Sequence, residues 1–549
     1  MQAPTEGTPH HADNPTPSHL GVSRRDLLRT TGTAAIAVSF GAMASPAWAA
    51  ETASFAVDPF RLGVASGDAT SRSVILWTRL APAPHALDAG TAQLPDVVDV
   101  HWSVSRVTPG TVHKPRYSGT VECRRDEGFS VHLDVETAVG GGRLVPGGEY
   151  SYEFAVPGPD GTTWRSTGRT RTAPDEDADT EARFVVMGCQ SFGQNQQFFP
   201  IGQNHLRQRT AGELDAGPLP HFGVFVGDYM YEFGGKWATG QDAVALQRPC
   251  ETLDEYRLRY AWYKARPDLQ DFHRNYPMYG VPDDHEWWND IYGGTIARSR
   301  FERFNAATQA YWENMPMRAR PVDTLVDGRP NTRTKGSLEL HRSVRWGKNL
   351  NLVLVDVRQH RRIDDTTMLG EAQLGQVVQW LREDTATWSA VASGGPIAVF
   401  GERNIEWCQF DSDREAVTAV LAERPNRVSL GGDLHCGMVN AVRRHDDDVS
   451  DFIATEFVTA PASSGGDVKW GELIHTGEPT DGAGTTIERA TFIEGGQPQR
   501  GYLQCTVGRR DWVSEFFVGN DTTRRDGPVA SAGRFRIASG TVGAHRVDD

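Results

Sequence analysis

Short runs of alternating apolar and polar residues fill the first part of the chain, from about residue 60 onward. Such alternation over about four to eight residues is typical of half-buried β-strands. Turn-forming stretches such as Pro109-Gly110 and Gly140–Gly142 separate the runs. The predicted strands are Ser73–Leu80, Val98–Ser105, Ser130–Thr137 and Glu149–Val156. This spacing predicts a small β-sandwich that ends near Pro174.

The pattern changes after the acidic linker Asp175–Glu181. Continuous apolar runs now alternate with longer stretches that have helical spacing, of which Glu371–Asp384 and Asp413–Arg424 are examples. The predicted buried strands are Arg183–Gly188, Phe222–Gly227, Met278–Val281, Leu350–Val357, Pro396–Gly401 and Arg427–Gly432. Strands that alternate with helices predict an α/β domain of stacked layers.

The N-terminus carries the parts of an export signal in their usual order. Ser23–Leu28 contains a twin-arginine pattern, the apolar run Ala34–Ala44 is too short to span a bilayer, and Ala47-Trp48-Ala49 offers a cleavage site. We therefore expect residues 1–49 to be a signal peptide read by the twin-arginine export machinery. The mature protein would then be extracellular, periplasmic or associated with the cell wall. No other run approaches the roughly 20 apolar residues of a membrane helix, so we expect no transmembrane segment in the mature chain.

Charge and cysteine content narrow the class of protein. The net charge of −15 over 549 residues argues against binding nucleic acid by bulk attraction, although a local cationic pocket for phosphate stays possible. The six cysteines include no Cys-x-x-Cys pair, which excludes a zinc ribbon or a thioredoxin-like motif. Disulfides after export stay open, and metal ligation is one reason for an exported protein to keep a thiol reduced.

Polar side chains follow several of the predicted strands at the points where they end. In α/β sheets ligands gather beyond the carboxyl ends of the strands, so residues far apart in the chain can meet there. Each motif alone is also typical of an ordinary turn or core position, and only their joint occurrence indicates a site. The residues are Cys189, Asp228, Tyr231, Asp283-Asp284-His285-Glu286, Arg358, Asp433 and His435.

These residue types suit metal-assisted phosphoryl chemistry. Thiolate, carboxylate, phenolate and imidazole groups can together hold a transition metal, and clustered aspartates suit calcium or magnesium. Two ions a few ångströms apart can clamp a phosphoryl group and ionise a water molecule. Arg358 could then bind phosphate oxygens in a bidentate manner.

The chain resembles the PhoD-type alkaline phosphatase/phosphodiesterase family over nearly its whole mature length. The resemblance rests on Phe60–Leu80 (FRLGVASGDATSRSVILWTRL), Gly168–Pro174 (GRTRTAP) and the later motifs GCQSF, GDYMYE, DDHE, VDVRQHR, LGEAQLGQVVQWL and GGDLH. It implies a calcineurin-like metallophosphoesterase fold, α/β with two β-sheets flanked by helices. We therefore expect an N-terminal β-sandwich domain over residues 50–174 and a catalytic domain over 183–549.

The resemblance also implies a ligand set and an activity. Family members hydrolyse phosphomonoesters and phosphodiesters with a ferric ion and calcium. Carried onto this chain, Asp228 would bridge the two metals, and His285 and Arg358 would face the phosphate. The implied iron ligands are Cys189, Asp228, Tyr231 and His435, and the further calcium ligands are Asp284 and Asp433.

Some questions stay open at this level. His285 could either stabilise the transition state or protonate the leaving oxygen. Pro282, Val357 and His360 depart from the usual family motifs without removing a predicted ligand, and they leave the substrate preference open. A phospholipase D-like phosphodiesterase is an alternative, although no membrane-docking segment is evident. A catalytically inactive cell-surface binding protein is another, and the retention of every implied ligand argues against it.

Overall fold

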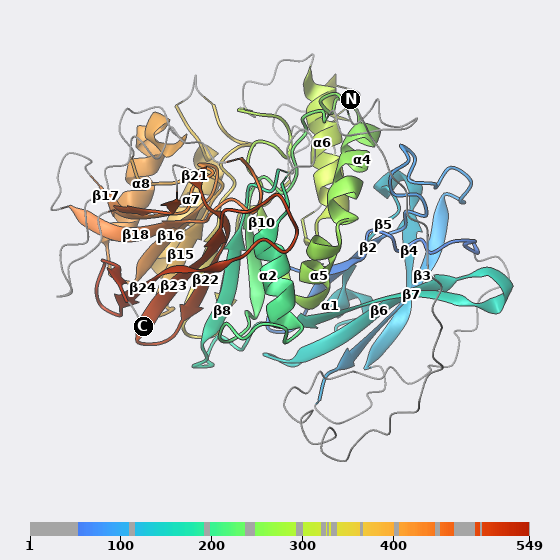
Figure 1. Ribbon diagram of the computed structural model, residues 1–549, viewed down its shortest axis with the longest axis horizontal. Helices are drawn as coiled ribbons and strands as arrows, with labels where there is room; N and C mark the ends of the chain where they lie inside the picture. Colours follow the sequence, from blue (N-terminus) through green and yellow to red (C-terminus); the bar gives the residue numbers. More distant parts are fainter. Residues whose placement is uncertain are drawn as a thin grey trace, which may run out of the picture. The chain divides into compact units, whose positions relative to one another are not determined.

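A computed structural model describes the greater part of the chain (Figure 1). The described residues are 53–108, 116–191, 198–235, 247–291, 300–319, 325–326, 329–330, 338–362, 366–399, 406–444, 451–465, 489–494 and 497–547. All of them belong to one of the two units into which the chain divides, residues 40–549. The expected signal peptide, residues 1–49, lies outside the described residues. Among the described residues, no helix has the length and apolar character that crossing a membrane requires.

A four-stranded antiparallel sheet lies in the N-terminal region (Figure 1). Its strands, in sheet order, are β4 (Tyr117–Arg124), β3 (Val97–Arg106), β6 (Glu149–Pro157) and β7 (Thr163–Arg171). It shares one hydrophobic core with three further strands of the same region, β1 (Val64–Gly67), β2 (Ile75–Arg79) and β5 (Ser130–Asp134). The N-terminal region is therefore built of β-strands packed face to face.

The predicted strand 130–137 is too long at its C-terminal end. The structure ends β5 at Asp134 and forms a short helix, α1 (Val135–Ala138). The Asp134 side chain accepts a hydrogen bond from the backbone N–H of Glu136 and so caps the helix. Alternation of residue type could not reveal this cap.

Strands β1, β2 and β5 are also one end of a ten-stranded sheet. Its order is β25-β24-β23-β22-β8-β9-β10-β1-β2-β5. The sheet passes from the N-terminal region to the rest of the chain through the parallel pair β1–β10, where Gly67 faces Met278. The boundary between the two expected domains, at residues 174–183, therefore stays a prediction. The strands of the sheet not yet given are β8 (Ala182–Met187), β9 (Phe222–Val226), β10 (Met278–Val281), β22 (Arg500–Val507), β23 (Asp511–Gly519), β24 (Ala530–Ala538) and β25 (His545–Arg546).

A seven-stranded sheet forms the second large layer. Its order is β13-β14-β15-β16-β18-β17-β19, and β14, β15, β16 and β18 run parallel to one another. The strands are β13 (Arg342–Trp346), β14 (Leu350–Leu354), β15 (Trp388–Ala392), β16 (Arg427–Gly431), β17 (Met438–Arg443), β18 (Phe452–Val458) and β19 (Arg489–Thr491). Two short hairpins complete the described strands, β11 (Leu325–Val326) with β12 (Arg329–Pro330) and β20 (Ile493–Glu494) with β21 (Gln497–Pro498).

One predicted strand is wrong. The apolar run that begins at Pro396 forms no strand over its described residues 396–399, and the preceding residues Trp388–Ala392 pair with β14 and β16 instead. The backbone N–H groups of Ile397 and Ala398 donate to the buried carboxylate of Glu456 at 2.6 and 3.2 Å. A side chain from another strand therefore takes the hydrogen bonds that a neighbouring strand would have taken.

The helices cover the outer faces of the two large sheets. Alternate residues of β8 show the arrangement: Phe184 and Val186 point into the core between the sheets, while Val185 and Met187 pack against the helices. Strand β14 does the same on the other side, with Leu352 facing the sheets and Val353 facing α7 and α8. Both faces of these strands are buried, which explains their continuous apolar sequences.

The order of layers is therefore helices, sheet, sheet, helices, and the α/β fold class is confirmed. The helices on the ten-stranded sheet are α2 (Ile201–Thr210), α4 (Leu253–Lys264), α5 (Pro267–Asn275) and α6 (Phe301–Asn314), and those on the seven-stranded sheet are α7 (Gly370–Glu383) and α8 (Asp411–Ala422). Sequence signals set several of their ends. Thr252 and Glu255, for example, form a reciprocal capping box at the start of α4.

Candidate active site

Three of the predicted iron ligands meet where β8, β9 and β16 end. Ligand atoms of Cys189, Asp228 and His435 all lie within 4.8 Å of one another, so the three could hold a metal ion. Cys189 and Asp228 are almost fully buried, and Cys189 forms no disulfide. The backbone N–H of Cys189 donates to Gly227 O at 3.2 Å, which holds the first two loops side by side.

The backbone is unusual at four of the predicted ligands. The φ angle is 54° at Cys189, 55° at Asp228, 65° at Asp433 and 51° at His435. This left-handed conformation is uncommon for residues other than glycine, and it is found disproportionately at functional sites. Each strand end thus turns sharply, and the turns bring the four residues to the same edge of the sheets.

Gly227 lets two of these loops approach each other. Its φ is 86°, and a Cβ atom at this position would lie 2.3 Å from Cβ of Asp283. Only glycine fits such a conformation and such a distance. The strand end that carries Asp228 can therefore lie directly against the loop that carries Asp284.

Tyr231 reaches the same group of atoms. Its hydroxyl donates to Asp228 Oδ2 at 2.8 Å and lies 2.8 Å from His435 Nε2. Ser464 donates its Oγ hydrogen to the same phenolic oxygen at 2.9 Å. His435 Nδ1 lies 3.0 Å from the carbonyl oxygen of Gly465, so Nδ1–H can donate there and leave Nε2 facing the phenol.

The donor set fits a bound cation. Burial, and then the neighbouring carboxylates, raise the pKa of the Cys189 thiol well above its ordinary value, and burial and Asp228 do the same for the Tyr231 phenol. Burial also raises the pKa of Asp228 to about 8, although His285 opposes the shift. Several acidic groups gathered in one buried place repel each other as anions, and a metal ion offsets that repulsion.

A second group of possible ligands shares Asp228 with the first. Ligand atoms of Asp228, Asp284 and His285 also lie within 4.8 Å of one another. Burial alone would raise the pKa of Asp284, but Arg358 and His285 outweigh it and lower that pKa to about 2. Asp228 is thus the only residue common to the two groups found among the described residues, which is the position expected of a bridging carboxylate.

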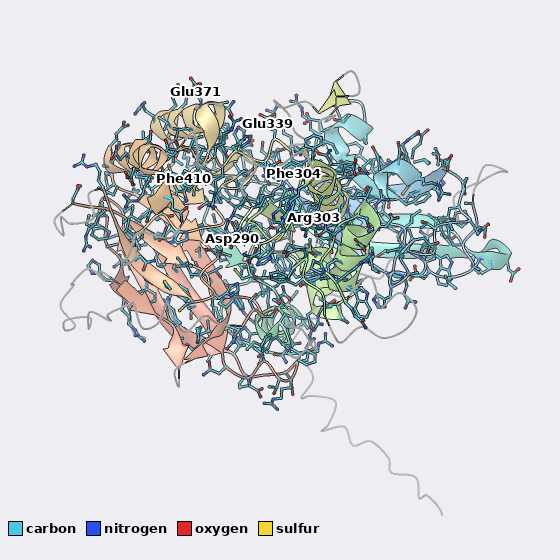
Figure 2. All side chains as sticks on the ribbon, turned by 90° about the horizontal axis from the view of Figure 1, so that it is seen from above. Asp290, Arg303, Phe304, Glu339, Glu371 and Phe410 are labelled. Carbon is cyan, nitrogen blue, oxygen red and sulfur yellow. The ribbon has the colours of Figure 1, made fainter. Side chains whose placement is uncertain are left out.

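The loop after Asp284 is anchored to α6 by aromatic contacts. Trp287 stacks on Phe304 with ring centroids 5.6 Å apart, and the guanidinium of Arg303 lies 4.9 Å from the Trp288 ring centroid. Figure 2 labels Arg303 and Phe304 on this helix, and it also labels Asp290. The backbone N–H of Asp290 donates to Asp284 Oδ2 at 2.6 Å. The loop therefore fixes the Asp284 carboxylate through a hydrogen bond to its Oδ2 atom.

Asp433 lies beside these groups but belongs to neither of them. Its Oδ1 is 3.8 Å from Arg358 Nη2, and about a quarter of its side chain is exposed. Arg358 itself is 1 % exposed and binds the Asp283 carboxylate in a bidentate manner, with Nε–Oδ1 at 2.6 Å and Nη2–Oδ2 at 3.0 Å. The guanidinium expected to meet phosphate is thus held in place by Asp283, and its Nη2 also lies 3.9 Å from Asp284.

His285 is paired with Glu232. Nδ1 of the histidine lies 2.7 Å from Glu232 Oε2, and Nε2 is 4.0 Å from Asp284 Oδ1. Glu232 Oε1 also accepts the backbone N–H of Asn289 at 3.0 Å. Burial alone would lower the pKa of His285, but the carboxylates of Asp284, Asp228 and Glu232 outweigh it and raise that pKa well above its ordinary value.

Glu286 ties together the two loops that carry Asp228 and Asp284. Its carboxylate accepts the backbone N–H groups of Asp228 at 3.2 Å, Tyr229 at 2.6 Å and Asp283 at 2.8 Å. Burial and the Asp228 charge raise the pKa of Glu286 well above its ordinary value, and the amide donors oppose that shift. Glu286 is fully buried, and within the described part of the chain its hydrogen bonds all come from main-chain N–H groups.

Sequence reasoning missed these supporting residues. Glu232 and Glu286 lie inside the motifs GDYMYE and DDHE, but those motifs do not reveal that each glutamate reaches residues more than 50 positions away. Asp283 and Glu286 both belong to the DDHE motif, which predicts no role for either of them. Ser464 follows a plain Ala-Ser sequence that carries no signal of its contact with Tyr231.

Comparisons with known proteins match the chain over most of its length. The profile of the PhoD-like phosphatase family matches residues 184–516, more than half of the chain, and the profile of the PhoD-like phosphatase N-terminal domain matches residues 45–174. Alkaline phosphatase D of Bacillus subtilis (strain 168) is 26% identical over 534 residues, which cover 90% of this chain and 83% of that protein.

The fold is shared with a solved structure of PhoD. A structure of PhoD has a TM-score of 0.72 at 23% identity, with 90% of this chain and 94% of that chain covered. A purple acid phosphatase from yellow lupin (Lupinus luteus) seeds has a TM-score of 0.47 at 11% identity, with 87% and 73% covered. From the family matches and the B. subtilis relative it follows that the chain belongs to the PhoD-like phosphatase family and is a phosphoester hydrolase.

Proposed function

We propose that this enzyme hydrolyses phosphomonoesters and phosphodiesters with the help of a ferric ion and calcium. The observation that carries the proposal is the sharing of Asp228 between two groups of possible metal ligands. The iron set would be Cys189, Asp228, Tyr231 and His435, and the calcium set would be Asp228, Asp284 and Asp433. Two cations bound in this way supply charge stabilisation for the phosphoryl group and acidify a water molecule.

The side chains of the chain itself would orient the substrate and manage the proton. Glu232 fixes Nδ1 of His285, so that the Nε2–H of a protonated His285 can donate to an oxygen of the phosphate ester. Asp283 fixes the planar guanidinium of Arg358 by two parallel hydrogen bonds. Arg358 then adds fixed positive charge between Asp284 and Asp433, close to where a phosphate would bind.

The shared carboxylate of Asp228 also bears on the two alternative functions. A catalytically inactive binding protein has no use for two groups of ligand atoms joined through one buried carboxylate. A phospholipase D-like enzyme would use the same chemistry on a larger, apolar substrate. Hydrolysis rates on different substrates distinguish it from the main proposal. Hydrolysis rates on a chromogenic phosphomonoester, a chromogenic phosphodiester and phosphatidylcholine, measured with iron and calcium content on one sample, compare these readings directly.

The metal assignment predicts a visible absorption band in the same sample, from charge transfer between a tyrosinate or thiolate and ferric iron. Tyr231→Phe is expected to weaken or shift this band because its phenolic oxygen lies among the ligand atoms. Tyr229→Phe is the matched control, since Tyr229 is also buried but its hydroxyl forms a hydrogen bond with His273 at 2.6 Å. A colourless, iron-free protein with full activity would contradict the ferric site.

Export is the second part of the proposal. The twin-arginine pattern, the short apolar run and the Ala-Trp-Ala sequence in residues 1–49 support passage through the twin-arginine machinery. Replacing Arg24 and Arg25 together by lysine is expected to keep the enzyme in the cytoplasm, whereas the same change at Arg124 and Arg125 should not. The measurement is phosphodiesterase activity in exported and cytoplasmic fractions, and unchanged export of the Arg24/Arg25 variant would overturn the signal assignment.

A further inference from the structure

Phe233 is an exposed aromatic residue beside the candidate site. Within the described part of the chain, six large apolar side chains are exposed, and Phe233 is the only aromatic one among them, with 47% of its surface accessible. Its neighbours in sequence, Tyr231 and Glu232, are both buried. Single exposed aliphatic residues are common on protein surfaces, but an exposed aromatic ring next to catalytic groups needs a reason.

The ring of Phe233 touches a residue expected to face the substrate. It packs edge to face on His285, with centroids 5.0 Å apart and an interplanar angle of 70°. The ring centroid of His285 lies 4.0 Å from that of Tyr231, and the centroids of Tyr231 and Phe233 are 6.4 Å apart, so the three rings form one cluster. Phe233 is the exposed member of this cluster, whereas Tyr231 and His285 are buried.

The main chain that carries Phe233 is firmly held. The guanidinium of Arg259, which is 2% exposed, donates to the carbonyl oxygens of both Tyr231 and Phe233 and to that of Arg248. Glu232, between them, is fixed by His285 and Asn289. The exposed ring is therefore attached to a rigid segment of main chain, as is typical of a pre-organised binding surface.

We propose that Phe233 is a specificity-determining residue that binds a flat aromatic group on the ester of the substrate. The inference rests on the proposed function, because it requires the phosphate to lie beside His285. Aromatic rings attract one another in offset or edge-to-face geometry beyond the effect of buried area alone. An aryl phosphoester would thus gain a contact that a small alkyl ester cannot make.

Phosphonates that differ only in their organic group test this proposal. Phenylphosphonate is expected to inhibit the wild-type enzyme with an inhibition constant about tenfold lower than that of methylphosphonate. In Phe233→Ala most of that difference should disappear, because the inhibition constant of phenylphosphonate rises while that of methylphosphonate is unchanged. Phe233→Tyr should keep the preference, and Leu214→Ala, which truncates another exposed apolar residue that lies elsewhere, should leave both constants as they are.

The possible results distinguish failure of the role of Phe233 from failure of the position proposed for the phosphate. Equal inhibition by both phosphonates in the wild type, or an equal change for both in Phe233→Ala, would overturn the role of Phe233 and leave phosphoester hydrolysis intact. If neither phosphonate competes with a hydrolysed phosphoester, the position proposed for the phosphate fails, and the role of Phe233 fails with it. Iron and calcium content measured on each variant excludes an effect that arises from loss of the metals.

Discussion

Asp228→Asn is expected to lower kcat for a chromogenic phosphodiester by about a thousandfold, because the charge stabilisation at stake is worth roughly 4 kcal/mol. Asparagine keeps the size of the side chain but removes the negative charge. Among the described residues, Asp228 is the one that belongs to both groups of possible ligands, so this single change would affect both of the proposed metals. The substitution also disturbs the hydrogen bond from the Tyr231 hydroxyl to Asp228 Oδ2, because an amide NH₂ group can take the place of that oxygen.

The measurement is kcat together with the iron and calcium content of the purified variant. Asp526→Asn is a suitable control, because the same chemical change is made on a side chain that is 71% exposed. Activity should be unaffected there. If Asp228→Asn kept half or more of the wild-type rate, the bridging role of Asp228 would be wrong, whatever its metal content.

Glu286→Gln is expected to reduce activity or metal affinity by about 10- to 100-fold although Glu286 is not a predicted ligand. Its two carboxylate oxygens accept three backbone N–H groups, from Asp228, Tyr229 and Asp283. Glutamine has one acceptor oxygen, so its NH₂ group must face at least one amide donor in a buried place. Leaving such a donor without an acceptor costs about 1–3 kcal/mol.

The matched control for this prediction is Glu456→Gln. Glu456 is also fully buried and also accepts two backbone N–H groups, but these belong to Ile397 and Ala398, and neither residue adjoins a predicted ligand. Its contact with β16 is a hydrogen bond from the Ser429 hydroxyl, not from a backbone N–H group. Both variants should unfold at lower urea concentration than the wild type. Only Glu286→Gln should lose iron or calcium affinity in equilibrium titrations. Equal metal affinity in the two variants would refute a positioning role for Glu286.

The fold could be predicted from the sequence where local pattern decides the structure. Met278–Val281 is a strand with the predicted bounds, since four consecutive apolar residues in a sheet buried on both faces leave little alternative. The pattern failed at Pro396, where a distant carboxylate takes the backbone hydrogen bonds, and at Asp134, where a side chain caps a helix. Both failures come from polar side chains that compete with regular structure.

In the site, too, local motifs could be predicted from the sequence and contacts between distant loops could not. The eight residues expected to bind metal or phosphate come from motifs at strand ends, and the structure places all eight at one edge of the sheets, with Asp433 outside the two ligand groups. Their roles stay predictions. The sequence could not show that Asp283 binds Arg358 or that Glu232 binds His285, because those contacts join loops that are far apart in the chain. The residues that hold a site in place are found only once the loops have been brought together.

The sheet that runs from β5 to β25 limits how this enzyme can be shortened or recombined. An exchange of the N-terminal region for that of a relative would have to preserve hydrogen bonds across the β1–β10 pair, including the bond from Asp68 N to Met278 O at 3.1 Å. A chain that starts after the linker would leave β10 as a bare sheet edge, open to pairing with another molecule. Strand β10 leads directly to Asp283 and Asp284, so such association would reach the candidate site. The N-terminal region thus covers an edge of β10 that would otherwise be open to association, and its removal is expected to promote aggregation.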